Sequence, residues 1–523
     1  MKKIYYLLIA FMLVGVLIGC SNSETNKDNN NDNSAVSINK TGFPIVDEEI
    51  TIEMVGQKNP IQAEWKDMSI LQEYEDMTNI HIEWETPSGD AYEEKFNLLM
   101  GSGDYSDAFF GGDISTGDQM KYGDEDILIP LEDLIDNYAP NFQKLLDEKP
   151  DLRRNITTPD GHIYALPTVI DVPRDLTGPK LWINKKWIDE ANLEMPETVD
   201  DLYSILKAFK ERDADIIPMG SSEADDIKYG LMGAFGYLGS NDINVIDDEV
   251  IFVPETDNYK EFLKYMNKLY SEGLLDQETF TQDAQQLNAK GQNMRLGMFM
   301  DAGAFLKVPE EESGDYVALP PLTSSINDEL MWPISSGVAQ GTFAITDRNE
   351  HPEATMRWVD YFYSDEGSVF IGTTGGIEDV DWEWTGEAKE KWKQIEMEGK
   401  SLAEANAERT PAAGSFVPHY MSKEWVHKED SPLNNNIDNE VVEKYEDHFE
   451  VAFPDVYFTK EQRNELSSLK SDIDKYIEQM QGEFIVGKAS FDEWDNYLDR
   501  LEKMDLERFK EIHQDAYDVW NEN

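Results

Sequence analysis

The sequence predicts an α/β protein of two or three domains, and three observations lead to that prediction. Short apolar runs alternate with amphipathic helical stretches along the body of the chain. The chain has 523 residues, which is enough for several domains with large cores. Cys20 is its only cysteine, so disulfides, cysteine-ligated zinc and a cysteine nucleophile in the body are excluded, and the core must hold the fold.

The apolar runs predict a β-α-β-α-β unit at the start of the body and a helical region at its end. The first strands are expected at residues 51–55, 80–84 and 107–110, and the first helix at residues 65–78. Farther on, Thr198 and Asp201 form a capping-box pattern before apolar residues at helical spacing. The same spacing recurs over residues 262–270, and the chain from residue 458 onward is predicted to be nearly all helical.

Two extended apolar segments end in prolines before the α/β pattern restarts. They lie at residues 164–167 and 316–322. We interpret both as hinge strands, at which the chain crosses between two lobes.

The first residues predict a lipoprotein signal. Lys2 and Lys3 precede an apolar run over residues 4–18, which ends in Gly19 and Cys20. The run is shorter than the ~20 residues that a membrane-spanning helix requires. Residues 1–19 are therefore expected to be a cleaved signal peptide, and Cys20 is expected to carry the lipid.

The segment after Cys20 predicts a tether. Residues 21–40 are rich in Asn, Asp and Ser and contain almost no apolar side chains that could be buried. Such a composition is typical of disordered segments. We expect residues 20–44 to link the lipidated cysteine to the folded body.

The formal net charge of −61 excludes nucleic acid as a partner. It is typical of a solvated acidic surface, and it repels polyanions over long distances. Polyanionic sugars are therefore poorer candidate ligands than neutral ones. The exception would be a local basic cluster facing the site, such as Arg174, Lys180, Lys185 and Lys186.

Catalytic motifs were sought because a membrane-tethered glycoside hydrolase would share the size and aromatic content of this chain. The sequence contains no HExxH, GxSxG or glycine-rich dinucleotide turn, and its seven histidines show no metal-ligand spacing. Residues 482–488 imitate a phosphate loop, but Ala489 replaces the required Ser or Thr. No catalytic residue, metal ligand or cofactor is predicted. A hydrolase stays as the alternative, and an adhesion or signalling lipoprotein is a third possibility.

Several motifs, in this order and spacing, resemble one family over nearly the whole mature chain. They are GSGDYSDAFFGG (101–112), LIPLEDLIDNYAPNFQKLL (128–146), DGHIYALP (160–167), LWINKKWIDEANLEMPETVDDLYSILKAFK (181–210), LGMF (296–299) and FIVGKASFDEWDNYLDRLEKMDLERFKEIHQDAYDVW (484–520). The chain thereby resembles the extracellular solute-binding lipoproteins of carbohydrate ABC importers. Within the family 1 solute-binding proteins, it is similar to the LplA-like and alginate-binding group.

The resemblance implies a type II periplasmic-binding-protein-like fold, in which two α/β lobes joined by hinge strands close on a sugar. Lobe one is then expected at 45–168 and 323–400, and lobe two at 169–322 and 401–523. The expected function is capture of an oligosaccharide, predicted to be neutral, and its delivery to the permease of an ABC transporter. The protein is expected to be a monomer on the extracytoplasmic face of the cell membrane, held there through its lipid anchor only.

The sequence departs from the family at one point. Many relatives carry a calcium-type loop after the helix that corresponds to residues 198–210. Here the chain reads KERDADIIPMG, which is too short for that loop and lacks the glycine needed for its turn. We therefore carry no metal site over from the family.

Aromatic and polar residues near expected strand ends are the candidate ligand contacts. Open α/β sheets bind ligands at the carboxyl ends of their strands, and aromatic rings can stack on sugar rings. For lobe one and the segment that returns to it, the candidates are Gln57, Trp84, Phe110, Asp113 and Trp332. For lobe two, they are Phe235, Tyr237, Asp301 and Phe305.

Overall fold

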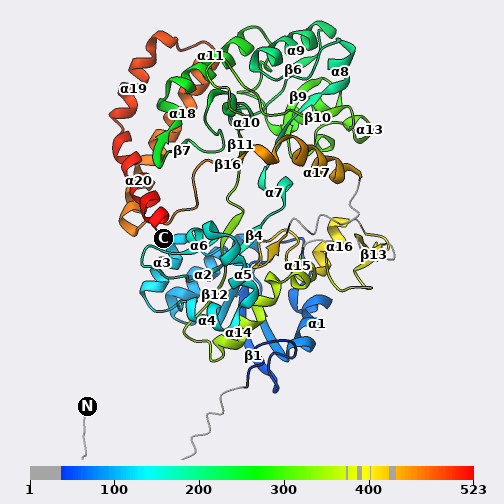
Figure 1. The fold of residues 1–523 in the computed structure, drawn as a ribbon, viewed down its shortest axis with the longest axis vertical. Coiled ribbons are helices and arrows are strands. Elements are labelled where there is room, and N and C mark those ends of the chain that lie inside the picture. Colours follow the sequence, from blue (N-terminus) through cyan, green and yellow to red (C-terminus); the bar gives the residue numbers. More distant parts are fainter. Residues whose placement is uncertain (1–36, 373–374, 386–390, 401, 423–431, 523) are drawn as a thin grey trace, which may run out of the picture.

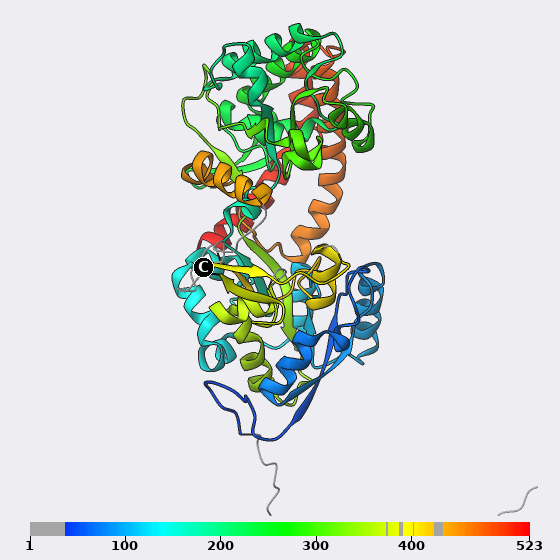
Figure 2. The same cartoon turned by 90° about the vertical axis from the view of Figure 1, so that its right-hand side faces the viewer.

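The computed structural model describes residues 37–372, 375–385, 391–400, 402–422 and 432–522. Two lobes lie one above the other along the longest axis, and the C-terminal helices run beside both (Figure 1). Figure 2 shows the same stacking after a quarter turn, with the first described residues at the end of lobe one remote from lobe two. Within these ranges, no helix is both long and apolar enough to span a membrane.

Lobe one is built on a mixed six-stranded sheet. In sheet order, its strands are β15 (Tyr420–Met421), β4 (Leu166–Ile170), β12 (Val338–Ile345), β3 (Ala108–Phe110), β1 (Ile50–Gly56) and β2 (Ile80–Glu85). β1 runs parallel to β2 and β3, whereas β12 is antiparallel to β3 and β4. The carboxyl ends of β1 and β3 therefore lie at one edge of the sheet. The predicted first three strands are confirmed.

Helices and a cluster of buried aromatic rings complete lobe one. Its helices are α1 (Ser69–Thr78), α2 (Gly89–Ser102), α3 (Thr116–Asp124), α4 (Glu132–Tyr138), α5 (Pro140–Glu148), α6 (Pro150–Ile156), α14 (Pro352–Asp360), α15 (Asp365–Ile371) and α16 (Leu402–Arg409), and a small hairpin is formed by β13 (Trp382–Thr385) and β14 (Lys391–Gln394). Phe110 lies at the centre of the core, with its ring centroid 5.9 Å from that of Trp65 and 5.6 Å from that of Trp358.

Lobe two has a four-stranded sheet and its own core. In sheet order, its strands are β10 (Tyr316–Ala318), β5 (Lys180–Asn184), β9 (Leu296–Asp301) and β6 (Ile217–Met219). Around them lie α8 (Lys185–Glu190), α9 (Val199–Arg212), α10 (Ala224–Leu231), α11 (Asp257–Ser271), α12 (Ala284–Gln292), α13 (Glu310–Ser313), α17 (Pro432–Lys444) and a hairpin of β7 (Ile243–Ile246) and β8 (Glu249–Phe252). β6 is parallel and β5 antiparallel to β9. The ends of β6 and β9 therefore lie at the edge where β5 begins.

The sequence signal for α9 is confirmed in detail. The Thr198 side chain accepts a hydrogen bond from the Asp201 N–H (3.1 Å), and the Asp201 carboxylate accepts one from the Thr198 N–H (3.1 Å). This capping box satisfies two of the N–H groups that a helix start leaves unpaired. After α9, only residues 213–216 connect to β6, so the connection is shorter than the roughly 12-residue loop of a calcium-binding EF-hand.

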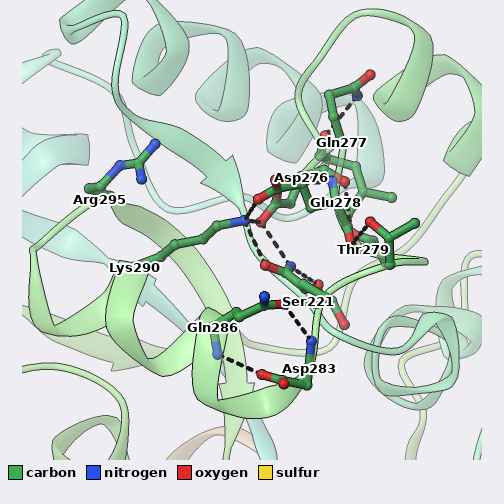
Figure 3. A network of polar contacts seen from close by, with 12 residues as sticks. Ser221, Asp276, Gln277, Glu278, Thr279, Asp283, Gln286, Lys290 and Arg295 are labelled. Carbon is green, nitrogen blue, oxygen red and sulfur yellow. Dashed lines mark hydrogen bonds and ion pairs between the residues drawn. The ribbon is translucent and has the colours of Figure 1, made fainter.

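An ion network around the largely buried Lys290 side chain ties the segment after α11 to the rest of lobe two (Figure 3). The Lys290 ammonium lies 2.7 Å from Asp276 Oδ2, 2.6 Å from Glu278 Oε2 and 2.6 Å from Gln282 Oε1. Gln282 in turn donates a hydrogen bond to the carbonyl oxygen of Ser221 (2.6 Å), just beyond the end of β6. The cation is thus enclosed by carboxylate and amide oxygens, as a charge in a poorly solvated place must be.

Three strands mark the crossings between the lobes. β4 leads through α7 (Pro173–Leu176) to β5, as the hinge prediction for residues 164–167 implies. β11 (Trp332–Ile334) leads back to β12 and pairs in parallel with β16 (Phe449–Val451). The second predicted hinge, at 316–322, is wrong, because its first residues form β10, which pairs with β5 inside lobe two.

The lobe boundaries differ from the expected ones. Thr323 forms a bridge with Thr198 in lobe two, and the lobe-one sheet is rejoined only at β12. Ala412 and Val417 pack in the core of lobe one, and β15 is an edge strand of its sheet. Lobe one therefore extends to Met421, because this segment supplies apolar side chains and a strand that the sheet edge would otherwise lack.

The expected tether is shorter than predicted where the structure describes it. The Asn39 N–H donates a hydrogen bond to the Ile45 carbonyl oxygen (2.8 Å), and Phe43 packs edge-on against Tyr361 at 5.2 Å. Residues 39–44 therefore belong to lobe one, because Phe43 adds an apolar ring to a sequence that is otherwise polar. The predicted signal peptide and Cys20 lie outside the described residues.

The predicted helical C-terminal region is confirmed as α18 (Lys460–Ile485), α19 (Trp494–Glu502) and α20 (Leu506–Glu522). These helices contact both lobes. Just before α18, Tyr457 donates a hydrogen bond to Gln119 of lobe one (2.9 Å), whereas Phe484 at the other end is buried in the core of lobe two. Trp520 of α20 returns to lobe one, where its indole N–H donates a hydrogen bond to Asn155 (2.8 Å).

Candidate functional site

A groove of three adjoining hollows begins beyond the carboxyl ends of β1 and β3 in lobe one and continues to α3 and the start of α18. The outer hollow, of about 150 Å³, and the central hollow, of about 340 Å³, share Gln57, Gly89 and Asp113. The third, of about 390 Å³, shares Ser115 and Asp118 with the central hollow. The groove lies at the sheet edge where ligands of open α/β sheets bind.

Tyr92 of α2 gives the central hollow an unpaired hydroxyl. The side chain is 6% exposed, and its Oη has no hydrogen-bond partner among the described residues. Burial raises the pKa of this phenol, and the nearby charge of Asp113 raises it further. A Cβ at Gly112 would lie 2.0 Å from Oη, so glycine is required for the ring to occupy this place. A buried unpaired hydroxyl is costly, and a ligand hydroxyl could satisfy it.

Asp113 and Gln57 add a carboxylate and an amide to the same hollow. Asp113 has a left-handed backbone with φ of 44°, a conformation that non-glycine residues adopt mainly at special positions. Part of the residue is exposed, yet desolvation of its carboxyl raises the pKa of Asp113 above its ordinary value. The Gln57 amide nitrogen lies 3.5 Å from the Gly89 carbonyl oxygen, at the limit of a hydrogen bond. Both side chains are available to sugar hydroxyls.

Phe416 supplies the exposed aromatic ring of the outer hollow. It is 57% exposed and follows a turn held by a hydrogen bond from Asn59 to the Gly414 carbonyl oxygen (2.9 Å). Phe416 and Tyr92 were not predicted to line the site, since neither directly follows a predicted strand. The sequence signal for Phe416 is the Gly-Ser-Phe sequence at 414–416, which is typical of an aromatic residue in a turn.

The three aromatic residues predicted from lobe one and the returning segment lie in cores or pack against one instead. Phe110 has no exposed surface, and Trp84 is half-buried with its ring centroid 5.3 Å from that of Trp65. Trp332 is 1% exposed and stacks on Tyr445 at 4.0 Å. Phe110 and Trp332 offer no face to a ligand here, because the strand ends on which they lie are covered by packed side chains.

The lobe-two candidates lie at or near the packed core. Phe235 is 4% exposed and packs edge-on against Phe262, and Tyr237 is half-buried, which raises the pKa of its phenol. Asp301 ends β9 and forms an ion pair with Lys307 (3.1 Å). Phe305 is half-buried against the second lobe-two core. None of these residues lines the lobe-one groove.

The basic cluster that the sequence offered as an exception is neutralised. Arg174, Lys185 and Lys186 each form an ion pair with a carboxylate. Lys180 is 2% exposed and donates a hydrogen bond to the Arg174 carbonyl oxygen (2.8 Å). Burial lowers the pKa of Lys180 to about 8. Three of these four cations are therefore paired with carboxylates, and the fourth is buried.

In the part of the chain that the structure describes, no group of three or more His, Cys, Asp or Glu side chains is placed to hold a metal ion.

Comparisons with known proteins agree with this architecture. The family described as bacterial extracellular solute-binding protein matches residues 59–369. The chain is 30% identical over 548 aligned positions to the fructooligosaccharide ABC transporter substrate-binding protein FusA of Streptococcus pneumoniae, covering 100% of this chain and 98% of that protein.

Two solved structures share the fold. The S. pneumoniae FusA EF-hand mutant in complex with fructo-nystose has a TM-score of 0.70 at 28% identity, covering 91% of this chain and 100% of that one. A solute-binding protein from Bifidobacterium longum infantis, described as HMO binding, has a TM-score of 0.77 at 22% identity, covering 91% and 99%, and shows the fold alone. The predicted type II two-lobed fold is confirmed. The chain belongs to the bacterial extracellular solute-binding proteins.

Proposed function

We propose that this protein captures an oligosaccharide between its lobes and delivers it to the permease of an ABC importer. The observation that carries the proposal is the lobe-one groove, in which the unpaired Tyr92 hydroxyl lies beside Asp113 and Gln57. The FusA relative, aligned over the full chain, is described as a fructooligosaccharide-binding subunit of such a transporter. Its complexes with kestose and fructo-nystose supply suitable probes.

The residues of the groove suit the binding of sugar hydroxyls without chemistry. Tyr92 can donate to a hydroxyl oxygen, the Asp113 carboxylate can accept from a hydroxyl, and the Gln57 amide can do both. Phe416 can stack on the C–H face of a sugar ring at the outer end. Tyr237 and Asp301 are the lobe-two residues that we propose to meet the ligand when the lobes close.

The proposed ligand is neutral over most of its length, and the proposed protein is a monomer. The net charge of −61 supports neutrality, because it opposes the approach of a polyanion. The same charge opposes self-association. Lipid attachment at Cys20 would hold the protein on the extracytoplasmic face of the cell membrane, next to the permease.

We also propose that the protein is not an enzyme, in contrast to a tethered glycoside hydrolase. A hydrolase needs two carboxyl groups about 5 to 9 Å apart on either side of the scissile bond. The relatives named above are binding proteins of transporters. Prolonged incubation with kestose should leave the sugar intact by chromatography, and release of a shorter sugar would support the hydrolase instead.

Calorimetric titration with fructo-nystose tests the binding site. Tyr92→Phe and Asp113→Asn should each weaken binding about 2- to 10-fold, since each removes one hydrogen bond. Phe416→Ala should weaken it at least as much. None should lower the melting temperature appreciably, because Asp113 and Phe416 are exposed and the Tyr92 hydroxyl has no protein partner.

Matched controls make that result specific. Tyr270→Phe and Phe280→Ala change similar side chains of lobe two outside the groove and should bind normally. Wild-type affinity in all three groove variants would show that the ligand binds elsewhere. No binding by the wild type would count against a fructooligosaccharide as the ligand.

The anchor is tested separately. Cys20→Ser should abolish incorporation of labelled lipid and release the protein into the medium or leave an unprocessed precursor. Membrane retention with normal processing of this variant would contradict lipid attachment at Cys20.

A further inference from the structure

The third hollow of the groove has a different charge from the rest of the protein. We call it the basic hollow, because Lys121, Lys460 and Arg463 line it. It lies between α3 of lobe one and the start of α18, the helix that continues into the core of lobe two. Three cations around one hollow are unusual in a chain with 106 acidic and 45 basic residues.

The positive charges of the basic hollow are not neutralised by ion pairs. Among the described residues, none of the three cations forms an ion pair with a carboxylate. Lys121 donates a hydrogen bond to the Tyr122 hydroxyl (3.0 Å), and Arg463 donates to the carbonyl oxygens of Phe458 (2.5 Å) and Gly117 (3.5 Å). These oxygens orient the cations but carry no full charge.

The Lys290 network of lobe two differs from the basic hollow in its charge balance (Figure 3). There the ammonium is enclosed by the carboxylates of Asp276 and Glu278, so its charge is balanced within the protein. In the basic hollow, Asp118 is the carboxylate among the lining residues, and its Oδ2 accepts a hydrogen bond from the Ser115 hydroxyl (2.7 Å). Among the residues that line the hollow, three cations thus face one carboxylate, and outside it the charge of Glu125 also acts on Lys121.

The position and the volume of the basic hollow both suit one end of the proposed ligand. The basic hollow shares Ser115 and Asp118 with the central hollow, so a ligand lying along the groove would end in it. Its volume of about 390 Å³ lies within the range of small-molecule sites, roughly 300 to 1,000 Å³. Arginine and lysine are the side chains that recognise carboxylate and sulfate groups.

We propose that the basic hollow binds a single anionic group, a carboxylate or a sulfate, at one end of the saccharide in the groove. This inference rests on the proposed function. A single anionic group suits the rest of the molecule, because Glu93 and Asp113 line the central hollow and the net charge repels a polyanion. The ligand class is therefore an oligosaccharide with one acidic end.

The test compares two matched sugars by calorimetry: fructo-nystose, and fructo-nystose oxidised at one terminal primary alcohol to a carboxylate. The wild type should bind the oxidised sugar at least 10-fold more tightly at low salt, and added salt should reduce this advantage. Lys460→Gln should reduce this advantage several-fold, measured as the ratio of the affinities for the two sugars. Arg463→Lys keeps the charge and should retain most of the advantage, whereas Arg463→Gln should lose it.

The control is Lys470→Gln on the same helix, where Lys470 forms an ion pair with Asp474 on an exposed face. This variant should retain the full preference for the oxidised sugar. A wild type that binds both sugars equally would overturn the inference and leave the proposed function standing. If neither sugar binds, a fructooligosaccharide is not the ligand, and the inference fails with it.

Inorganic sulfate alone distinguishes a saccharide group from a free anion. Under the proposal, sulfate should compete weakly with the oxidised sugar and should not compete with fructo-nystose. Tight binding of sulfate by the wild type, lost in Lys460→Gln, together with no preference for the oxidised sugar, would assign the hollow to a free inorganic anion and contradict the proposal.

Discussion

At the scale of single residues, burial separates the groove side chains from the aromatic residues predicted at strand ends. Trp332 is 1% exposed and stacks on Tyr445 at 4.0 Å. Trp332→Ala should therefore lower the free energy of unfolding by about 3 to 5 kcal/mol, measured by denaturant titration. Phe416→Ala is the control and should cost little stability. Unchanged stability with weakened sugar binding in Trp332→Ala would restore the role of this residue as a ligand platform.

The residue scale is also where the sequence was least informative. Gln57 and Asp113 were predicted to line the site and do line the groove, because short loops after strands β1 and β3 carry them. Phe110 occupies the last position of the same strand β3, but its side chain faces the core. A pattern of apolar and polar letters does not show which aromatic ring at a strand end is covered. Packing decides whether such a ring is covered. Packing also brings Phe416 to the groove, although it lies more than 300 positions after Gln57 and Asp113 in the sequence.

At the scale of elements, the start of α5 depends on one buried carboxylate. Asp360 Oδ1 accepts hydrogen bonds from the N–H groups of Asn141 (3.0 Å) and Phe142 (2.9 Å). Desolvation by burial raises the pKa of Asp360 to about 6 despite these bonds. Because this pKa lies above that of the unfolded chain, about 3.9, the group favours folding most below pH 4, and this contribution is lost as pH rises through 6.

Asp360→Asn tests that linkage. Asparagine keeps an oxygen that can accept hydrogen bonds from α5, but it does not titrate. The free energy of unfolding of the variant, relative to that of the wild type, should therefore rise from pH 4 to pH 7. The change should be on the order of 3 kcal/mol by urea unfolding. Asp136 is an exposed residue of α4, and Asp136→Asn is the control. Its stability relative to the wild type should change little between pH 4 and pH 7. A pH-independent difference for Asp360→Asn would contradict the raised pKa.

Elements were better predicted than the connections between lobes. The capping box of α9 and the apolar spacing of α11 and α18 are local signals, and the structure confirms these helices. The second hinge was misplaced because an extended apolar segment can be either a crossing or a sheet strand. Residues 316–318 pair with β5, and that partner is more than 100 positions away in the sequence.

At the scale of the whole molecule, two lobes with separate sheets are joined by β4, β11 and β16 and spanned by α18. Local residue patterns predicted the α/β class and the existence of hinges, whereas the resemblance supplied the two-lobed arrangement. The length of lobe one could not be predicted, because α16 and β15 return to it after a long stretch without strong periodicity. A body of this kind suits hinge closure on a ligand.

The most direct test of lobe closure is small-angle X-ray scattering with and without saturating fructo-nystose. Ligand that bridges the lobes should reduce the radius of gyration, because hinge closure brings the two lobes together. The double variant Asp113→Asn, Phe416→Ala should show a smaller reduction at the same sugar concentration. A wild type that binds fructo-nystose by calorimetry without any change in its radius of gyration would contradict capture between closing lobes.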